Sequence, residues 1–354
     1  MPKFLDLHHN KFYKQKMRIK KNVSLKEFNT FGIDVKANFY CEINSLKDLD
    51  SLAETEEYKK YDKLILGGGS NILFTKNVSA LVIKNNLKGI TKKDLNENQV
   101  IVKAAAGEDW HNLVLYCLEN NLAGIENLSL IPGSVGAAPM QNIGAYGVEI
   151  KDVFHSLEAF NIQNKKIEIF DNKTCAFGYR ESIFKGEAKG KYIIISVSFI
   201  LSKTPNINTA YGAIEQELQQ MGITQPTIRD VSEAVCAIRT SKLPNPKEIG
   251  NAGSFFKNPM IETSLLIELK EIYPTIVNYK VSSTHVKLAA GWLIEQCGWK
   301  GKQIGNCGVH NKQALVLVNN GSATGQEIYN LSTEIINSVK EKFKVTLERE
   351  VNIV

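Results

Sequence analysis

The chain has 354 residues but no apolar run of the ~18 residues that a membrane-spanning helix needs, and its N-terminus lacks the apolar core of an export signal. Its six cysteines are scattered and none forms a C-x-x-C pair, which argues against a zinc ribbon or a redox dithiol. No H-E-x-x-H motif, paired-aspartate cluster or Cys/His set indicates a metal. We therefore expect a cytoplasmic protein with reduced, mostly buried thiols and no bound metal.

Most of the sequence also lacks clusters of like charge. The net charge is +6, and the only basic concentration lies between Lys11 and Lys21. Such a tail can contact nucleic acid or lipid, but we expect a solvated extension with no nucleic-acid or membrane partner. Met17 offers a plausible shorter start. The length predicts two or three domains.

One stretch, 130–147, is rich in glycine, alanine and proline. It is too apolar for an exposed linker and carries too many Gly and Pro residues for a helix or a regular strand. Gly133, Gly136, Gly144 and Gly147 permit positive φ or a close approach of the backbone to a partner. A buried irregular backbone must satisfy its N–H and C=O groups, so the composition favours a large polar ligand lying along this stretch.

A second glycine-rich segment, 67–71, directly follows an expected strand. Three successive glycines let backbone N–H groups point at an anion, and Ser70 and Asn71 add donors, which suits a pyrophosphate. The segment is not the G-x-G-x-x-G fingerprint, whose third glycine would fall on Ile72, and no Gly-Lys-Ser/Thr follows to make a P-loop. Alone it is more often an ordinary turn. Together, the two segments favour a long dinucleotide gripped at both ends.

Short strands alternate with helices in the first half of the chain, and capping residues mark helices in the second. We expect strands at 37–43, 63–66, 80–83, 100–104, 191–201 and 314–318, a hairpin over 155–170, and helices over 45–55 and 108–121. Thr227 and Thr324 are expected to cap two later helices. The alternating segment 345–353 predicts an edge or surface strand. These patterns predict two α+β lobes.

Two side chains could carry chemistry, and each also has an ordinary structural explanation. Arg180 can clamp a carboxylate through two hydrogen bonds, or it can pair with Glu181 at the surface. Ser254 lies in a tight turn that does not match the Gly-x-Ser-x-Gly nucleophile elbow. It is therefore a turn residue or a proton donor to a strongly basic group such as a carbanion.

Polar residues near the end of a helix and near the end of the sequence are further candidates. Arg239 and Lys242 follow the helix that Thr227 caps, where the dipole favours cations, but they also suit a phosphate or carboxylate. Glu350 shares the polar face of the last segment with Glu348, and such carboxylates are usually solvated. The histidines form no pattern, and we assign them no role.

Several segments together resemble the UDP-N-acetylenolpyruvoylglucosamine reductase (MurB) family of flavoenzymes in peptidoglycan synthesis. They occur in the family's order and spacing from about residue 22 onward, at 29–32, 66–73, 126–149, 177–185, 239–244, 250–259 and 347–351. Tyr211, between Ala210 and Gly212, resembles the mobile-loop tyrosine of the family's larger type.

The resemblance implies a three-domain α+β flavoenzyme with a PCMH/VAO-like cradle. It places an N-terminal extension at 1–21, FAD-binding subdomains at 22–98 and 99–206, and a substrate-binding domain at 207–354. It also implies that NADPH reduces non-covalently bound FAD and then leaves. UDP-N-acetylenolpyruvoylglucosamine takes its place, flavin N5 delivers hydride to the terminal vinyl carbon, and protonation of the neighbouring carbon gives UDP-N-acetylmuramate. We expect a monomer.

The resemblance further assigns roles to individual residues. Arg180 and Glu350 match the pair at the substrate carboxylate, and Ser254 matches the proton donor. An enolate is basic enough to take a hydroxyl proton. The FAD-contacting positions are Gly67, Gly68, Gly69, Ser70, Asn71, Ile72, Gly133, Ser134, Gly136, Asn142, Gly144, Tyr179 and Arg239. The substrate-contacting positions are Tyr211, Lys242, Asn258, Lys300 and Gln313.

Two departures and two alternative functions accompany this interpretation. Asn352 stands where family members often carry a basic residue, and Glu350 lies close enough to Val354 that fraying is expected. An FAD-dependent oxidase of the same fold is one alternative, although His111 and the cysteines lie outside the glycine-rich segments that would hold a covalent flavin. A non-catalytic nucleotide- or nucleic-acid-binding protein is the other, and it predicts a colourless protein.

Overall fold

A first, four-stranded sheet opens the structure, a computed structural model that describes residues 17–354. Its strand order is β1 (Lys20–Ser24), β2 (Lys36–Ile43), β5 (Val78–Asn85) and β3 (Lys63–Leu66), with β2, β5 and β3 parallel. Helices α1 (Leu46–Ala53) and α2 (Glu56–Lys60) follow β2. Ser45 and Asp48 form a capping box at the start of α1, as expected. Of the expected N-terminal extension, residues 1–16 lie outside the described part, and β1 begins at Lys20.

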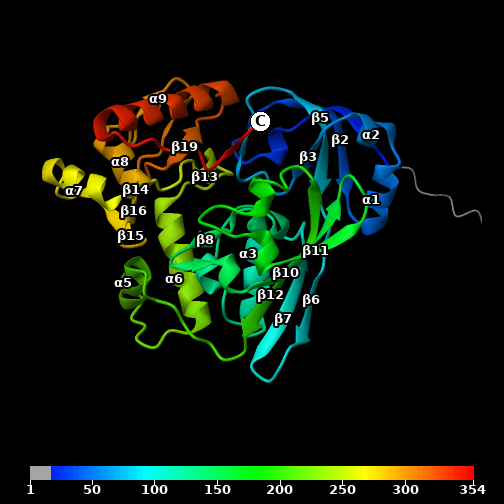
Figure 1. Ribbon diagram of the computed structural model, residues 1–354, viewed down its shortest axis with the longest axis horizontal. Helices are drawn as coiled ribbons and strands as arrows, with labels where there is room; N and C mark the ends of the chain where they lie inside the picture. Colours follow the sequence, from blue (N-terminus) through cyan, green and yellow to red (C-terminus); the bar gives the residue numbers. More distant parts are fainter. Residues whose placement is uncertain (1–16) are drawn as a thin grey trace, which may run out of the picture.

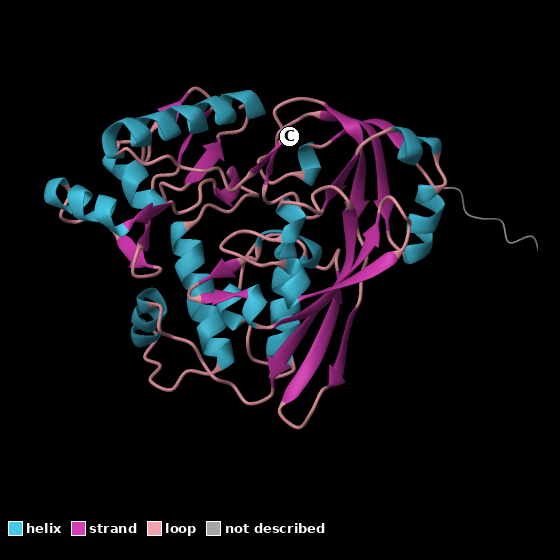
Figure 2. Cartoon of the chain, in the orientation of Figure 1, coloured by secondary structure: helices cyan, strands magenta, loops and turns pink. Residues whose placement is uncertain are grey.

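A second, five-stranded antiparallel sheet forms the long twisted ribbon seen in magenta in Figure 2. Its order is β11 (Ile167–Asp171), β10 (Phe154–Asn161), β12 (Tyr192–Ser202), β7 (Gln99–Ala105) and β6 (Ile90–Asp94). The hairpin expected over 155–170 is confirmed as β10 and β11. Helix α3 (Trp110–Glu119) has Asp109 as its N-cap and buries Trp110 edge-on against Phe199. The expected boundary at 98/99 falls inside the β6–β7 hairpin, so this pairing favours a boundary before Ile90.

The remaining chain forms a further group of helices and small sheets (Figure 1), part of which shares a hydrophobic core with the first sheet. Helices α5 (Gly212–Gln220) and α6 (Ile228–Lys242) pack together, and Thr227 caps α6 as predicted. The larger sheet contains β13 (Gly250–Ser254), β19 (Val316–Asn319), β18 (Cys307–Val309) and β17 (Gln303–Ile304). The smaller contains β14 (Met260–Glu262), β16 (His285–Leu288) and β15 (Asn278–Lys280). Helices α7 (Thr263–Ile272), α8 (Ala290–Gln296) and α9 (Gly325–Phe343) complete this part, and Thr324 caps α9.

The expected edge strand over 345–353 is wrong. Val345, Leu347 and Val351 of the alternating apolar face are buried, whereas Ile353 of the same face is exposed. Yet after α9 the segment pairs with its own region only through a bridge between Arg349 and Phe256. Beyond this bridge its hydrogen bonds go elsewhere: β20 (Asn352–Ile353) runs parallel to β4 (Ile72–Leu73) beside the first sheet. Figure 1 shows this red segment ending at the label C, beside the blue N-terminal part of the chain.

The expected fraying near Val354 is also wrong. The Val354 N–H donates to the Leu73 carbonyl at 2.9 Å, and the Val354 carbonyl accepts from the Thr75 N–H at 2.7 Å. Four of the six cysteines are buried, which confirms that the thiols are mostly buried. Within residues 17–354, no helix is both long and apolar enough to cross a membrane.

Candidate functional site

The two glycine-rich segments lie directly against each other. A Cβ added at Gly68 would lie 2.9 Å from the Gly133 Cα, and one at Gly67 would collide with the Ser134 hydroxyl. The Ser70 hydroxyl donates to the Pro132 carbonyl at 2.9 Å. Only glycine permits this approach, so the segments expected at opposite ends of a dinucleotide instead form one continuous surface.

Lys84 supports this surface and was missed in the sequence. It lies on β5, and its Nζ donates to the Gly67 carbonyl at 2.5 Å. Burial lowers the pKa of Lys84, and the charge of Lys88 acts in the same direction. A lysine directly after the apolar run 80–83 was the available signal. An ammonium beside two glycine-rich loops adds the positive charge that a pyrophosphate requires.

The stretch 130–147 is partly helical, contrary to expectation. Val135–Gln141 forms a 3-10 helix, η3, that contains Pro139, and a short hairpin of β8 (Gly144–Ala145) and β9 (Val148–Glu149) follows. A 3-10 turn tolerates this composition because it needs few regular hydrogen bonds. Gly136 is required, because a Cβ there would lie 2.5 Å from the Ala106 Cβ.

The backbone N–H and carbonyl of Leu130 form hydrogen bonds with side chains rather than within a helix or sheet. Its φ is +58°, an unusual value for leucine. Its N–H donates to His111 Nδ1 at 3.0 Å, and its carbonyl accepts from Arg239 Nε at 3.2 Å. Burial lowers the pKa of His111, which keeps the ring neutral and able to accept. His111 therefore has a structural part that the sequence did not reveal, while Arg239 reaches the predicted stretch.

Asn142 fastens the glycine-rich stretch to the segment that carries Arg180. The side chain is fully buried, and its amide donates to Glu149 Oε2 and to the Gly178 carbonyl, each at 3.0 Å. Its Oδ1 accepts from the Lys151 N–H at 3.1 Å. The side chain of this predicted FAD-contacting residue thus makes its hydrogen bonds within the protein.

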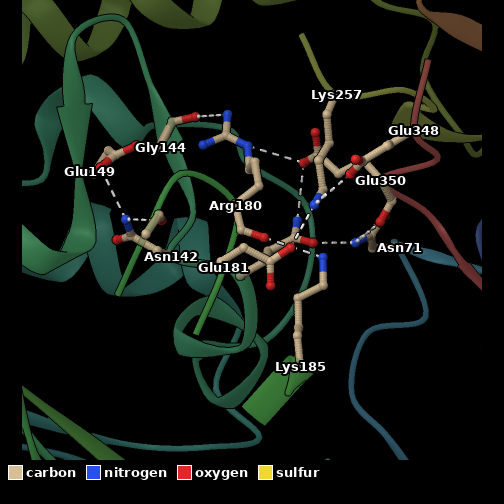
Figure 3. A network of polar contacts seen from close by, with 12 residues as sticks. Asn71, Asn142, Gly144, Glu149, Arg180, Glu181, Lys185, Lys257, Glu348 and Glu350 are labelled. Atoms are coloured by element: carbon tan, nitrogen blue, oxygen red, sulfur yellow. Dashed lines mark hydrogen bonds and ion pairs between the residues drawn. The ribbon is translucent and has the colours of Figure 1, made fainter. Parts of the chain in front are cut away.

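Arg180 and Glu350 meet in an ion pair at the centre of Figure 3. Arg180 Nε donates to Glu350 Oε1 at 3.1 Å, and Nη2 donates to the Gly144 carbonyl at 2.7 Å. The two side chains are only 19% and 12% exposed. Arg180 has a φ of +56°, a strained value that directs its side chain toward the glycine-rich stretch.

The ordinary explanations for these two residues do not hold. Glu181 pairs with Lys257 at 2.6 Å instead of with Arg180. Glu348 is 75% exposed, whereas Glu350 is turned inward. Burial raises the pKa of Glu350, against the opposing effects of Arg180, Lys185 and Lys257. The result is a largely buried carboxyl group whose neutral form is favoured by burial and whose charged form is favoured by three nearby cations.

Ser254 is placed beside this pair through the backbone. It ends β13 and is exposed, while the next two residues, Phe255 and Phe256, are almost completely buried. The Glu350 N–H donates to the Phe255 carbonyl at 2.8 Å. The two buried rings anchor the turn, so the Ser254 hydroxyl lies at the surface next to the segment that carries Glu350.

Among the predicted substrate-contacting residues, Tyr211 contacts the glycine-rich stretch. Tyr211 precedes α5 and stacks edge-on against Tyr146 of the glycine-rich stretch, with ring centroids 5.3 Å apart. Tyr179 lies between Arg180 and a cation that the sequence did not reveal, Lys287, whose Nζ is 4.0 Å from the ring centroid. These contacts bring aromatic and cationic groups to the surroundings of Arg180.

The other predicted substrate residues make local contacts. Asn258 Oδ1 accepts from the Ala290 N–H at the start of α8, at 2.9 Å. Gln313 Oε1 accepts from the Leu315 N–H at 3.3 Å. Lys300 pairs with Glu295 at 2.9 Å, and Lys242 is exposed in the last turn of α6. Among residues 17–354, no group of three or more His, Cys, Asp or Glu side chains could hold a metal ion.

Known families match both halves of this arrangement. The family model described as FAD binding domain matches residues 39–168. The family model described as UDP-N-acetylenolpyruvoylglucosamine reductase, C-terminal domain, matches residues 245–354. The first match covers the two glycine-rich segments, and the second covers Ser254 and Glu350.

Curated relatives match almost the entire chain. A UDP-N-acetylenolpyruvoylglucosamine reductase from Flavobacterium johnsoniae is 52% identical over 96% of this chain and 100% of its own length. One from Amoebophilus asiaticus is 49% identical over the same shares. The crystal structure of the Thermus caldophilus UDP-N-acetylenolpyruvylglucosamine reductase has a TM-score of 0.66 at 22% identity, covering 95% of this chain and 99% of that one. This structural likeness supports the three-domain α+β fold.

Proposed function

Because the chain belongs to the UDP-N-acetylenolpyruvoylglucosamine reductase family, we propose that it reduces UDP-N-acetylenolpyruvoylglucosamine to UDP-N-acetylmuramate, with FAD bound and NADPH as reductant. The observation that carries the proposal is the Arg180–Glu350 pair, which lies against the Gly144 carbonyl of the glycine-rich stretch. The product is a precursor of peptidoglycan, so the enzyme acts in cell-wall synthesis.

The surface formed by Gly67–Asn71 and Gly133–Ser134 fits the FAD pyrophosphate. Side chains larger than hydrogen are excluded at Gly67 and Gly68, and Lys84 brings a buried positive charge to the same loop. When bound there, FAD supplies the hydride chemistry. Gly136, Asn142 and Ile72 hold the shape of this surface, and Tyr179 and Arg239 border it.

Arg180 and Glu350 would hold the carboxylate of the enolpyruvyl group. As a hydride adds to the vinyl carbon, negative charge builds on that carboxylate and the neighbouring carbon. The Arg180 guanidinium is fixed by two hydrogen bonds, so it can stabilise this charge without reorganising. Burial raises the pKa of Glu350, which favours its neutral form more than in an exposed glutamate and so reduces its repulsion of a substrate carboxylate.

Ser254 would donate the proton that completes the reaction. Its hydroxyl lies at the end of β13, one residue from the carbonyl that binds the Glu350 N–H. A hydroxyl proton is transferred only to a strong base, and an enolate is one. Tyr211 and Lys242 would bind the diphosphate, and Asn258, Lys300 and Gln313 other parts of the substrate.

The organisation around this site completes the proposal. We place the FAD-binding cradle over about 20–206, divided before Ile90, and the substrate-binding domain over 207–354. The protein would act as a cytoplasmic monomer without a nucleic-acid or membrane partner.

Two measurements on the purified protein test the function. A flavin spectrum that NADPH bleaches, and that the enolpyruvyl sugar nucleotide restores without oxygen, is the expected result. A colourless protein would instead indicate a non-catalytic binding protein. Peroxide formation at the full rate without the sugar nucleotide would indicate an oxidase.

A further inference from the structure

Gln141 links the FAD-binding loop to Glu350 through two hydrogen bonds, and a third joins Asn71 of that loop directly to the Glu350 backbone. Asn71 Nδ2 donates to Gln141 Oε1 at 2.7 Å. Gln141 Nε2 donates to Glu350 Oε1 at 3.3 Å. Asn71 Nδ2 also donates to the Glu350 carbonyl at 3.4 Å. Gln141 ends η3 and belongs to none of the residue sets assigned above.

The Glu350 carbonyl determines which group donates in each of these hydrogen bonds. A backbone carbonyl can only accept, so the Glu350 carbonyl requires the NH₂ end of the Asn71 amide to point toward it. The same NH₂ group then requires the oxygen of Gln141 to face Asn71. The remaining end of Gln141, its NH₂ group, must therefore point at the Glu350 carboxyl.

Both oriented donors reach the same carboxyl oxygen. Gln141 Nε2 and Arg180 Nε each donate to Oε1. A proton on Oε1 would face two N–H groups, which is unfavourable, whereas Oε2 receives neither of these donors. The charged and titratable groups around the carboxyl are Arg180, Lys185 and Lys257, with the Tyr179 phenol nearby. The proton that Glu350 takes up therefore belongs on Oε2.

We infer that Gln141 is a positioning residue for Glu350: held by Asn71, it occupies Oε1 and leaves Oε2 as the oxygen that carries the proton and meets the substrate carboxylate. The inference rests on the proposed function for its substrate. It also joins the FAD-binding loop directly to the group that acts on the substrate, because Asn71 belongs to that loop.

Replacing Gln141 by methionine tests the inference, because methionine has a similar length but no N–H group. The variant is expected to keep its FAD content and its rate of flavin reduction by NADPH within about twofold. Reoxidation by the enolpyruvyl sugar nucleotide should fall about tenfold. In the pH profile of the reoxidation rate, the limb that reflects Glu350 should move up by about half a pH unit or more, because a hydrogen bond to the ionised form is lost.

A second variant and a direct spectroscopic measurement keep the inference testable if methionine disturbs the loop. Gln141→Glu places a second acid beside Glu350. It should therefore shift the Glu350 limb of the pH profile to a higher pH than Gln141→Met does. The protonated Glu350 band, identified in infrared difference spectra by its absence from Glu350→Gln, should titrate in the same order in substrate-free holoenzyme. Met140→Leu, on the neighbouring and partly exposed side chain, is the matched control and should change neither quantity.

Two results would overturn the inference. One is an unchanged Glu350 titration in both Gln141 variants. The other is an equal loss in both half-reactions together with a loss of FAD, which would assign Gln141 to the cofactor loop alone. Absence of both half-reactions in the wild-type protein would reject the proposed function, while the infrared titration would still decide the part played by Gln141.

Discussion

Arg180 Nε lies 3.1 Å from Glu350 Oε1, although 170 positions separate the two residues in the sequence. The contact exists because the segment after α9 bridges Phe256 at Arg349 and then pairs with β4 beside the first sheet. Arg180 in turn reaches across from a residue with positive φ and binds the Gly144 carbonyl. One ion pair thus joins the terminal segment, the glycine-rich stretch and the segment around Arg180.

Replacing Arg180 by lysine should separate geometry from charge. Lysine keeps the charge but cannot donate to Glu350 and to the Gly144 carbonyl from one planar group. We expect the reoxidation of reduced flavin by the enolpyruvyl sugar nucleotide to slow by at least ~10-fold, with FAD content unchanged. Single-turnover stopped-flow absorbance measures this. Full activity of the lysine variant would show that charge alone suffices.

Glu350→Gln should change how the stability of the protein depends on pH. Burial raises the pKa of Glu350 in the folded state, so the folded protein binds this proton more tightly than the unfolded chain. The resulting stabilisation is complete below the unfolded pKa and is lost as the pH rises through the folded one. Because glutamine does not titrate, the melting temperature of the variant minus that of the wild type should increase from about pH 4 to pH 8. A constant difference would contradict the raised pKa.

Local patterns in the sequence predicted most of the regular elements. The strand before Gly67, the hairpin of β10 and β11, and the caps at Ser45, Thr227 and Thr324 each depend on residues close together in the chain. The direction of the segment 345–353 does not. Its alternation indicates that Val345, Leu347 and Val351 are buried, but not which distant strand completes its hydrogen bonds.

Gly69 should tolerate no side chain. Its φ is +66°, and an added Cβ would collide with the Phe28 carbonyl, a backbone atom that cannot move aside cheaply. We expect Gly69→Ala to lose bound FAD or to fold poorly, measured as the flavin absorbance per protein after gel filtration. Gly212→Ala is the control, since no atom lies within 4 Å of its Cβ and it begins a helix. Normal FAD content in Gly69→Ala would contradict the close contact.

Deleting residues 352–354 should weaken FAD binding. The deletion removes the bonds from Asn352 to the Asn71 carbonyl, at 3.2 and 2.9 Å, and those between Val354 and the Leu73–Thr75 backbone. Because these bonds hold the loop that contains Asn71, we expect the FAD dissociation constant to rise about tenfold, measured by flavin fluorescence. Ile353→Ser keeps every backbone bond at a partly exposed position and should bind FAD normally. Equal affinity in the deletion variant would mean that the terminal strand does not support the loop.

The sequence did not reveal those residues of the site whose roles depend on contacts between distant segments rather than on a local sequence motif. Lys84, Lys287 and His111 lie in no motif, and Gln141 lies in the glycine-rich stretch without being singled out there; each acquires its partner through the packing of segments that are not adjacent in the sequence. The family resemblance supplied Arg180 and Glu350, which the structure brings together. It could not show that Lys257 forms the ion pair with Glu181. Because of that pair, Arg180 pairs with Glu350 instead.

Ser254→Ala should affect only the step that needs a proton. The residue is exposed at the end of β13, while Phe255 and Phe256 anchor the turn from the core, so removal of the hydroxyl should leave the fold intact. We expect flavin reduction by NADPH at the wild-type rate and a loss of at least ~10²-fold in reoxidation by the enolpyruvyl sugar nucleotide. Ser264→Ala, at an exposed serine of α7, should change neither rate. An equal loss in both half-reactions would mean that Ser254 supports binding or folding, and the proton would then have to come from another group.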